Sequence, residues 1–372
     1  MFMRHYFPIF EKKAYINSCS QGAISYQVKN AYRQFLNDWQ ELGSPWELWV
    51  TKSEGVRAQF AALINAASDE VAVVTSASAG VNALASALDF SGERNKVIVD
   101  DYAFPTTAQI WHAQAKRGAE VVHLREQGSF IPTAAWEAAI DEQTLLVNLT
   151  HVCYRHGGVP DVAAIVEIAH RKGALVLLDS FQAAGTMPID VKALGVDFLV
   201  SGALKYLCAS AGIAWLYASQ SHINRLTPTD SGWFAQADIF AMDIYGNEPS
   251  PTARRFESGT PPVVNTYAAE AGLKLIEQVG IHAIDQQRRE LTEAIKSLAK
   301  LHGFTVATPA RHGSMIAIRA HEVEKLVGLL AADDVIVSSR DGNLRISPHF
   351  YNTLDDIERL FAGLRKHKQL LV

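Results

Sequence analysis

The sequence has few of the features that suit a nucleic acid or a membrane. Its 372 residues include 34 Lys and Arg and 39 Asp and Glu, and the net charge of -5 gives no reason to expect a polyanion partner. No stretch approaches the roughly 18 unbroken apolar residues of a membrane helix. The first 13 residues also lack the continuous apolar segment of a secretory signal. We therefore expect neither nucleic acid nor membrane as a partner.

Cysteine is equally scarce. The three cysteines, Cys19, Cys153 and Cys208, are widely spaced and include no C-x-x-C pair. An odd number at this spacing argues against a disulfide framework and against a zinc site. We expect no bound metal, and buried or half-buried thiols in a reducing cytoplasm. Of the three, only Cys19 is expected to be exposed.

Short apolar runs alternate with helical stretches over residues 71–217. The clearest runs are 96–100, 145–149, 174–179, 197–201 and 213–217. Between two of them, apolar residues at helical spacing over 162–172, followed by Gly173, predict a helix. Runs that are apolar on both faces, with helices between them, are typical of a mostly parallel sheet covered by helices. The sequence therefore predicts an α/β fold.

The C-terminal third follows a different pattern. Helices are predicted at 283–301, 322–331 and 354–367, and strands near 304–306, 315–319, 335–338 and 344–347. This order predicts a smaller α+β domain, and the consecutive prolines Pro261 and Pro262 suit a corner before it. We expect a large domain over 14–260 and a small domain over 261–372 that also includes 1–13.

Polar residues follow several of the apolar runs. Asp179 ends one run, Lys205 follows the next, and the Ser76–Gly80 segment opens a helix after the run at 71–75. Taken singly, such residues are more often a helix cap, a solvated charge and an ordinary helix start. Ligands of open α/β sheets gather at the carboxyl ends of the strands, where these three elements would meet. Together they predict pyridoxal phosphate (PLP), which needs an amine for its aldehyde, a carboxylate for its ring nitrogen and a helix N-terminus for its phosphate.

Two motifs resemble the class V aminotransferase family of PLP-dependent enzymes. Asp179-Ser-Phe-Gln182-Ala-Ala-Gly185, followed by Ser201-Gly-Ala-Leu-Lys205, is similar to the D-x-x-Q/H-A-x-G motif and lysine of that family. Kynureninases, cysteine desulfurases and isopenicillin-N-epimerase-like proteins belong to it. The resemblance covers nearly the whole chain. It implies the PLP-dependent transferase fold type I, a homodimer with shared active sites and a small amino-acid substrate.

The resemblance also implies roles for individual residues. Lys205 corresponds to the lysine that holds PLP as a Schiff base and then moves the substrate α-proton. Asp179 corresponds to the partner of the pyridinium N–H, and Gln182 to the residue beside the phenolic oxygen. Ala77 and Ser78 correspond to the turn that binds the phosphate.

Four further positions are similar to family sites. Phe104 resembles the aromatic residue that stacks on the PLP ring in kynureninases, although a core aromatic is the alternative reading. Trp233 and Thr260 lie in segments by which family dimers complete each other's phosphate site. Arg345 resembles the arginine that binds the substrate carboxylate, a bidentate task that suits a planar guanidinium. Its alternative is a surface arginine on a strand.

Some positions depart from the family pattern. Ala203 and Leu204 precede Lys205 where relatives often carry Ser, His or Tyr. Tyr154 stands where desulfurases usually have asparagine, and the Val152–Tyr154 segment is closer to kynureninases. No cysteine follows Cys208, although desulfurases carry a cysteine on a late loop. These departures leave the substrate class open.

We expect a PLP-dependent enzyme that acts on an amino acid, with a class V aminotransferase favoured. The alternatives are a kynureninase-like hydrolase, or a C–S or C–C lyase. A nicotinamide-dependent dehydrogenase is disfavoured, because no G-x-G-x-x-G follows a strand with an acidic residue about 20 positions later. A non-catalytic relative is disfavoured by the presence of Lys205, Asp179 and Arg345 together.

Overall fold

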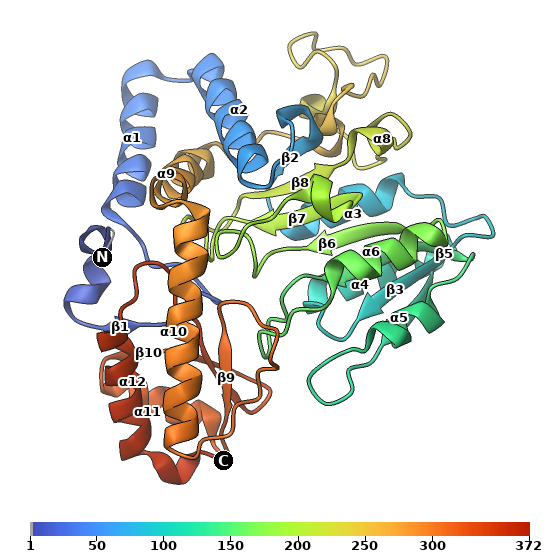
Figure 1. Cartoon of the computed structure of the whole chain (residues 1–372). Helices are drawn as coiled ribbons and strands as arrows, with labels where there is room; N and C mark the ends of the chain where they lie inside the picture. The colour runs from blue at the N-terminus through green and yellow to red at the C-terminus, as the bar shows by residue number, and fades with distance from the viewer. Residues whose placement is uncertain (1–2) are drawn as a thin grey trace.

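A seven-stranded sheet forms the centre of the computed structural model, which describes residues 3–372 (Figure 1). The strand order is β2-β8-β7-β6-β5-β3-β4. All pairs are parallel except those of β8, which runs antiparallel to both β2 and β7. The strands are β2 (Val71–Val74), β3 (Lys96–Asp100), β4 (Glu120–Leu124), β5 (Thr144–Thr150), β6 (Leu175–Asp179), β7 (Phe198–Gly202) and β8 (Ala214–Ala218). The predicted α/β fold with a mostly parallel sheet is confirmed.

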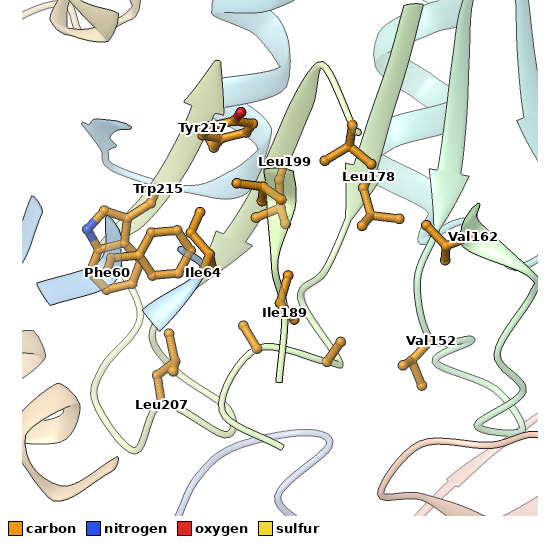
Figure 2. Close-up of a cluster of buried hydrophobic side chains, with 14 of the residues drawn as sticks. Phe60, Ile64, Val152, Val162, Leu178, Ile189, Leu199, Leu207, Trp215 and Tyr217 are labelled. Atoms are coloured by element: carbon orange, nitrogen blue, oxygen red, sulfur yellow. The ribbon is translucent and has the colours of Figure 1, made fainter. Parts of the chain in front are cut away.

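Helices cover both faces of this sheet, which explains why its strands are apolar on both sides. One face packs against α2 (Trp46–Leu63), α5 (Thr133–Ala139) and α6 (Val162–Arg171). The other packs against α3 (Ala77–Ala87) and α4 (Pro105–Ala113). Figure 2 shows part of the first layer, where Phe60 of α2 stacks on Trp215 of β8 with 4.6 Å between the ring centroids.

The C-terminal unit packs beneath the sheet in the view of Figure 1. Its antiparallel strands β11 (Ser338–Arg340), β12 (Asn343–Ile346) and β9 (Ile316–Arg319) lie in that order, and β10 (Val335–Ile336) belongs to a separate two-stranded sheet. The helices of this unit are α10 (Ile281–Leu301), α11 (Val323–Ala332) and α12 (Leu354–Lys366). The strand predicted at 304–306 is reduced to an isolated bridge between Val306 and Ile318. The N–H of Phe304 bonds the carbonyl of Ala299 and closes α10 instead.

The N-terminal segment belongs partly to this unit. β1 (Ala14–Tyr15) pairs in parallel with β10, and Ala14 and Ile16 are buried in the same hydrophobic cluster as α10, α11 and α12. Helix α9 (Val263–Val279) instead packs against α1 (Tyr26–Leu42) and α2, and Leu273 and Ile276 join the core of the sheet. The division into 14–260 and 261–372 with 1–13 stays a prediction. The hydrophobic clusters group α9 with the sheet, and Ala14 with the C-terminal unit.

Two short helices complete the fold, α7 (Val191–Leu194) and α8 (Gln220–Ile223). Over residues 3–372, none of the helices combines the length and the apolar character needed to cross a bilayer.

Candidate active site

A cavity of about 270 Å³ opens at the carboxyl ends of β2, β3, β5, β6 and β7. Its walls come from the turns that follow these strands and from the start of β8. Six of the nine predicted site residues line it, namely Lys205, Asp179, Gln182, Ala77, Ser78 and Phe104. Residues far apart in the sequence therefore meet at the sheet edge where an open α/β fold places its ligands.

Lys205 follows β7 and reaches into this cavity. Its Nζ lies 4.6 Å from the centroid of the Phe181 ring and 5.8 Å from that of Phe104. Burial lowers the pKa of Lys205 to about 8, and the positive charge of Arg345 adds to the effect, while Cys19 and Asp179 oppose it. Near neutral pH, a sizeable fraction of this amine is therefore uncharged and able to act as a nucleophile.

The backbone around Lys205 is held from two sides. The carbonyl of Leu204 accepts a hydrogen bond from Gly22 N at 2.8 Å. The carbonyl of Tyr206 accepts one from Nε2 of His349 at 2.7 Å. Burial lowers the pKa of His349 to about 3, so the ring stays neutral and can keep this proton on Nε2. The N-terminal segment and the C-terminal unit thus fix the position of the lysine together.

Gly185, the last residue of the predicted motif, has a structural reason to be glycine. Its φ is +87°, and a Cβ at this position would lie 2.6 Å from the carbonyl oxygen of Tyr206. Any larger residue would be strained and would push the Lys205 loop away. The motif glycine therefore positions the lysine without contacting the cavity.

Asp179 is the last residue of β6 and is 7% exposed. One carboxylate oxygen accepts a hydrogen bond from Phe181 N at 3.0 Å. Burial raises the pKa of Asp179 above its ordinary value, while the Phe181 N–H and the charge of Lys205 act to lower it. A carboxylate in this position gains from a cationic N–H partner, because such a partner favours the charged form.

A second carboxyl, Asp100, lies behind the cavity wall at the end of β3 and was not anticipated from the sequence. Its two oxygens accept hydrogen bonds from the backbone N and the hydroxyl of Thr150, at 2.7 and 2.8 Å. Burial raises the pKa of Asp100 to about 7, and the nearby Asp179 adds to the rise. Asp100 therefore anchors the end of β5 beside the cavity.

The N-terminus of α3 forms another wall. The side chain of Ser76 caps the helix by accepting a hydrogen bond from Ala79 N at 3.1 Å. The N–H groups of Ala77 and Ser78 lie in the first turn and have no acceptor within the helix. The hydroxyl of Ser78 is 2.8 Å from that of Thr106, which also lines the cavity. Free amides at the positive end of a helix dipole suit a phosphate.

Gln182 and Phe104 lie on the remaining walls. The Nε2 of Gln182 donates to the carbonyl of Cys19 at 3.1 Å, and its buried Oε1 has no partner among residues 3–372. Phe104 is 45% exposed, so the alternative reading as a core aromatic is wrong. Its ring meets that of Tyr154 edge to face at 5.1 Å. Phe181, in the middle of the motif, is a further wall residue that sequence reasoning did not single out.

Arg345 lies on β12, outside the cavity lining, but close enough for its charge to affect Lys205. It is 5% exposed, so it is not a surface arginine. Nη1 donates to the carbonyl of Tyr154 at 2.9 Å, and Nη2 lies 3.1 and 3.0 Å from the hydroxyls of Ser20 and Ser338. No carboxylate of the described chain lies within salt-bridge distance of it. The guanidinium therefore has a free charge beside the cavity.

Trp233 and Thr260 do not line the cavity. Trp233 packs edge to face on Trp46, with 5.7 Å between the centroids. Thr260 is exposed and borders a small separate cavity with Asp230 and Glu257. The role predicted for both residues requires a second copy of the chain, and it stays a prediction.

The expectation that Cys19 is exposed is wrong. All three cysteines are buried, and Cys19 is 1% exposed. Its segment runs beside the end of β12, where Cys19 N bonds the hydroxyl of Ser347 at 3.0 Å. The sequence gives no sign of this, because the partner lies 328 residues away.

Curated relatives cover nearly the whole chain. The "Uncharacterized aminotransferase YcbU" of Bacillus subtilis is 35% identical over 358 residues, 95% of this chain and 94% of that protein. A "Probable cysteine desulfurase" of Halalkalibacterium halodurans is 28% identical, covering 85% and 82%. A "Kynureninase" of Geobacillus thermodenitrificans is 25% identical, covering 99% and 92%.

Solved structures share the fold. A cysteine desulfurase of Thermococcus onnurineus NA1 has a TM-score of 0.88 at 21% identity, over 98% of this chain and 96% of that one. A C-DES variant with glycine covalently linked to its PLP cofactor has a TM-score of 0.89 at 21% identity, over 98% and 99%. The family model "Aminotransferase class-V" matches residues 23–360. The chain belongs to the class V aminotransferase family, as its motifs predicted.

Proposed function

We propose that this protein is a PLP-dependent enzyme that acts on the amino group of a small amino acid, with an aminotransferase reaction favoured. One observation carries this proposal. A half-buried lysine with a lowered pKa and a buried carboxylate face one cavity, at the carboxyl ends of the neighbouring strands β7 and β6 and beside a free helix N-terminus. The family and the PLP-containing neighbour support the same cofactor.

The residues present fit PLP. Its phosphate would be held by the first-turn amides of α3 at Ala77 and Ser78, and its ring nitrogen by Asp179. The Nε2 of Gln182 donates one proton to the carbonyl of Cys19, and its second N–H can be donated to the phenolic oxygen. Phe104 would cover one ring face. When bound, PLP supplies an electron sink for charge that develops at the substrate Cα.

The chain's own residues then have separable tasks. Asp179 keeps the ring nitrogen protonated, because its negative charge favours the cationic form. Lys205 binds the cofactor covalently, and as a free amine with a pKa of about 8 it can accept the α-proton near neutral pH. The aromatic rings of Phe181 and Phe104 lie near this amine and limit the access of water to it.

Arg345 supports an amino acid as the substrate. A buried guanidinium without an anion is unfavourable, and a carboxylate can pair with it through two parallel hydrogen bonds. Its charge acts on Lys205, which suits a substrate that carries both an amino group and a carboxylate.

A kynureninase-like hydrolase is the second candidate. It is favoured by the pair of Phe104 and Tyr154, whose edge-to-face rings form an aromatic wall suited to an aromatic substrate side chain. A C–S or C–C lyase uses the same cofactor chemistry. Release of more than one equivalent of keto acid per active site only when a second keto acid is present would distinguish transamination from both.

Further proposals concern the assembly and its location. We propose a homodimer in which Trp233 and Thr260 complete the phosphate site of the partner subunit. The exposure of Thr260 supports this, because the residue is free to meet another chain. A cytoplasmic location is proposed from the cysteine pattern of the sequence.

Reduction with borohydride tests the proposal. We expect the purified holoenzyme to be yellow, and reduction to fix the cofactor to the peptide that contains Lys205. Lys205→Ala should lose turnover, whereas Lys192→Ala, a matched change at an α7 lysine away from the cavity, should keep it. Cofactor fixed to another lysine, or a fully active Lys205→Ala enzyme, would refute the assignment.

A further inference from the structure

Three segments meet at the guanidinium of Arg345. Arg345 lies on β12, and Ser338 of β11 is its cross-strand partner. Both side chains therefore project from the same face of the sheet. Ser20 comes from the N-terminal segment. Its hydroxyl lies 3.1 Å from Nη2 of Arg345 and 3.3 Å from the hydroxyl of Ser338. Two hydroxyls therefore share one guanidinium nitrogen.

Counting protons in this group leaves donors without an acceptor on both Ser338 and Arg345. A guanidinium can only donate, so both hydroxyls accept from Nη2 and direct their own protons elsewhere. Ser20 donates its proton to the oxygen of Ser338. Around Ser338, the remaining neighbour is the thiol of Cys19 at 3.8 Å, which is a weak acceptor. The O–H of Ser338 and the buried Nε–H of Arg345 thus lack an oxygen acceptor within residues 3–372.

Within residues 3–372, the hydroxyl of the neighbouring Tyr154 makes no hydrogen bond to this group. Tyr154 contributes only its backbone carbonyl, which accepts from Nη1 of Arg345, while its ring packs on Phe104. An anion bound at Arg345 would therefore find its hydroxyl donor on β11.

We propose that Ser338 is a specificity residue that donates a hydrogen bond to the α-carboxylate of the substrate, and that Ser20 is a positioning residue that orients this hydroxyl. The inference rests on the proposed function and adds the group that, with Arg345, distinguishes an amino acid from an amine. It predicts that the two serines affect the binding of the carboxylate and leave the binding of the cofactor unchanged.

The test compares acids with their decarboxylated counterparts on the holoenzyme. The change in cofactor absorption is titrated with L-alanine against ethylamine, and with L-cysteine against cysteamine. Ser338→Ala should weaken the binding of both amino acids about tenfold, the effect of losing one hydrogen bond to a charged group, and leave both amines unchanged. Ser20→Ala should have a smaller effect in the same direction, and Ser338→Thr, which keeps the hydroxyl, should retain the discrimination.

Ser339→Ala is the matched control. Ser339 is the next residue of β11 and points to the opposite face, away from Arg345. The Ser339→Ala variant should bind acids and amines as the wild type does. If Ser338→Ala weakens the binding of acids and amines equally, or weakens the binding of neither, this inference is overturned while the proposed function stands. A wild-type protein whose absorption responds to no acid and no amine would overturn the proposed function as well.

Discussion

Lys205 and Arg345 carry like charges in the same buried region, and the charge of Arg345 helps to lower the pKa of Lys205. Burial lowers this pKa more than Arg345 does. A substrate carboxylate that neutralises Arg345 would remove the effect of its charge and raise the pKa of Lys205. Binding of the correct substrate would therefore strengthen the amine that has to accept its α-proton.

The lowered pKa of Lys205 predicts how the apoprotein captures its cofactor. Only the neutral amine attacks the aldehyde, so the rate of PLP incorporation should rise with pH and level off above a midpoint near 8. Stopped-flow absorption of the apoprotein mixed with PLP at a series of pH values measures this midpoint. A midpoint near 10.5, the ordinary value for lysine, would show that the amine is not buried as described.

Sequence reasoning predicted which residues approach one another, but not how they interact. Asp179 and Lys205 follow neighbouring apolar runs, and parallel strands bring their carboxyl ends to one edge. Phe181 was missed because an aromatic residue inside a motif is indistinguishable from core packing. The hydroxyl partner of Arg345 at Ser20 is 325 residues away, and no local pattern encodes such a contact.

At the scale of elements, the central strands could be predicted well, because both of their faces are buried and their sequences are continuous apolar runs. The run at 96–100 coincides with β3, and the run at 174–179 contains β6. The direction of β8 could not be predicted, since a buried strand has the same composition in either orientation. The short connection from β7 to β8 is the physical reason for the antiparallel pair, because a parallel pair needs a long crossover.

Asp197 lies just before β7, at the edge of the sheet where the parallel strands begin. It joins several elements there, at the end of the strands opposite the cavity. Its oxygens accept hydrogen bonds from Val176 N at 2.7 Å, from His170 at 2.9 Å and from His222 at 2.7 Å. Burial alone would raise the pKa of Asp197, but these hydrogen bonds outweigh it and lower the pKa. The carboxylate therefore ties β6, α6 and α8 to the start of β7.

Asp197→Ala should destabilise the protein by about 2 kcal/mol, because it leaves the N–H of Val176 without its acceptor. The pKa of Asp197 is lower in the folded than in the unfolded protein. The stabilisation is therefore complete at pH values above the pKa of the unfolded state, and it is lost as the pH falls through the pKa of the folded state. Thermal unfolding at pH 7 should show the full difference in Tm between the wild type and Asp197→Ala, and this difference should shrink in acid. Glu167→Gln, on the exposed side of α6, is the control and should change little. Equal Tm values at pH 7 would contradict this role.

At the scale of the whole molecule, the two predicted site residues outside the cavity bear on assembly. Trp233 lies at the base of a surface loop in which Ile244 and Tyr245 are 83% and 95% exposed. Phe240 and Met242 of the same loop are also exposed, and a group of exposed large apolar side chains suits contact with another chain. Both observations agree with the proposed dimer with shared sites.

Mixing two inactive variants tests the shared sites. In Thr260→Asp the added negative charge should repel the phosphate of the partner's cofactor, and Lys205→Ala lacks the amine. If each site uses Thr260 from one subunit and Lys205 from the other, every mixed dimer has one intact site, and a 1:1 mixture should recover about a quarter of wild-type activity. Recovery should follow subunit exchange, measured by tagged co-purification. Mixed dimers without any activity would place both residues in the same site.

The path of the N-terminal segment has a consequence for biosynthesis. Asn17 pairs with Ser347, and Ser20 reaches Arg345, which is translated 325 residues later, so the early segment must wait for its partners. A nascent chain can form the parallel strands around Lys205 as they leave the ribosome, but it cannot fix the lysine loop until the segment with β12 and His349 has also emerged. The enzyme should therefore acquire its cofactor only after that segment is available. A chain stalled before β12 would carry every strand of the sheet and still fail to hold PLP tightly.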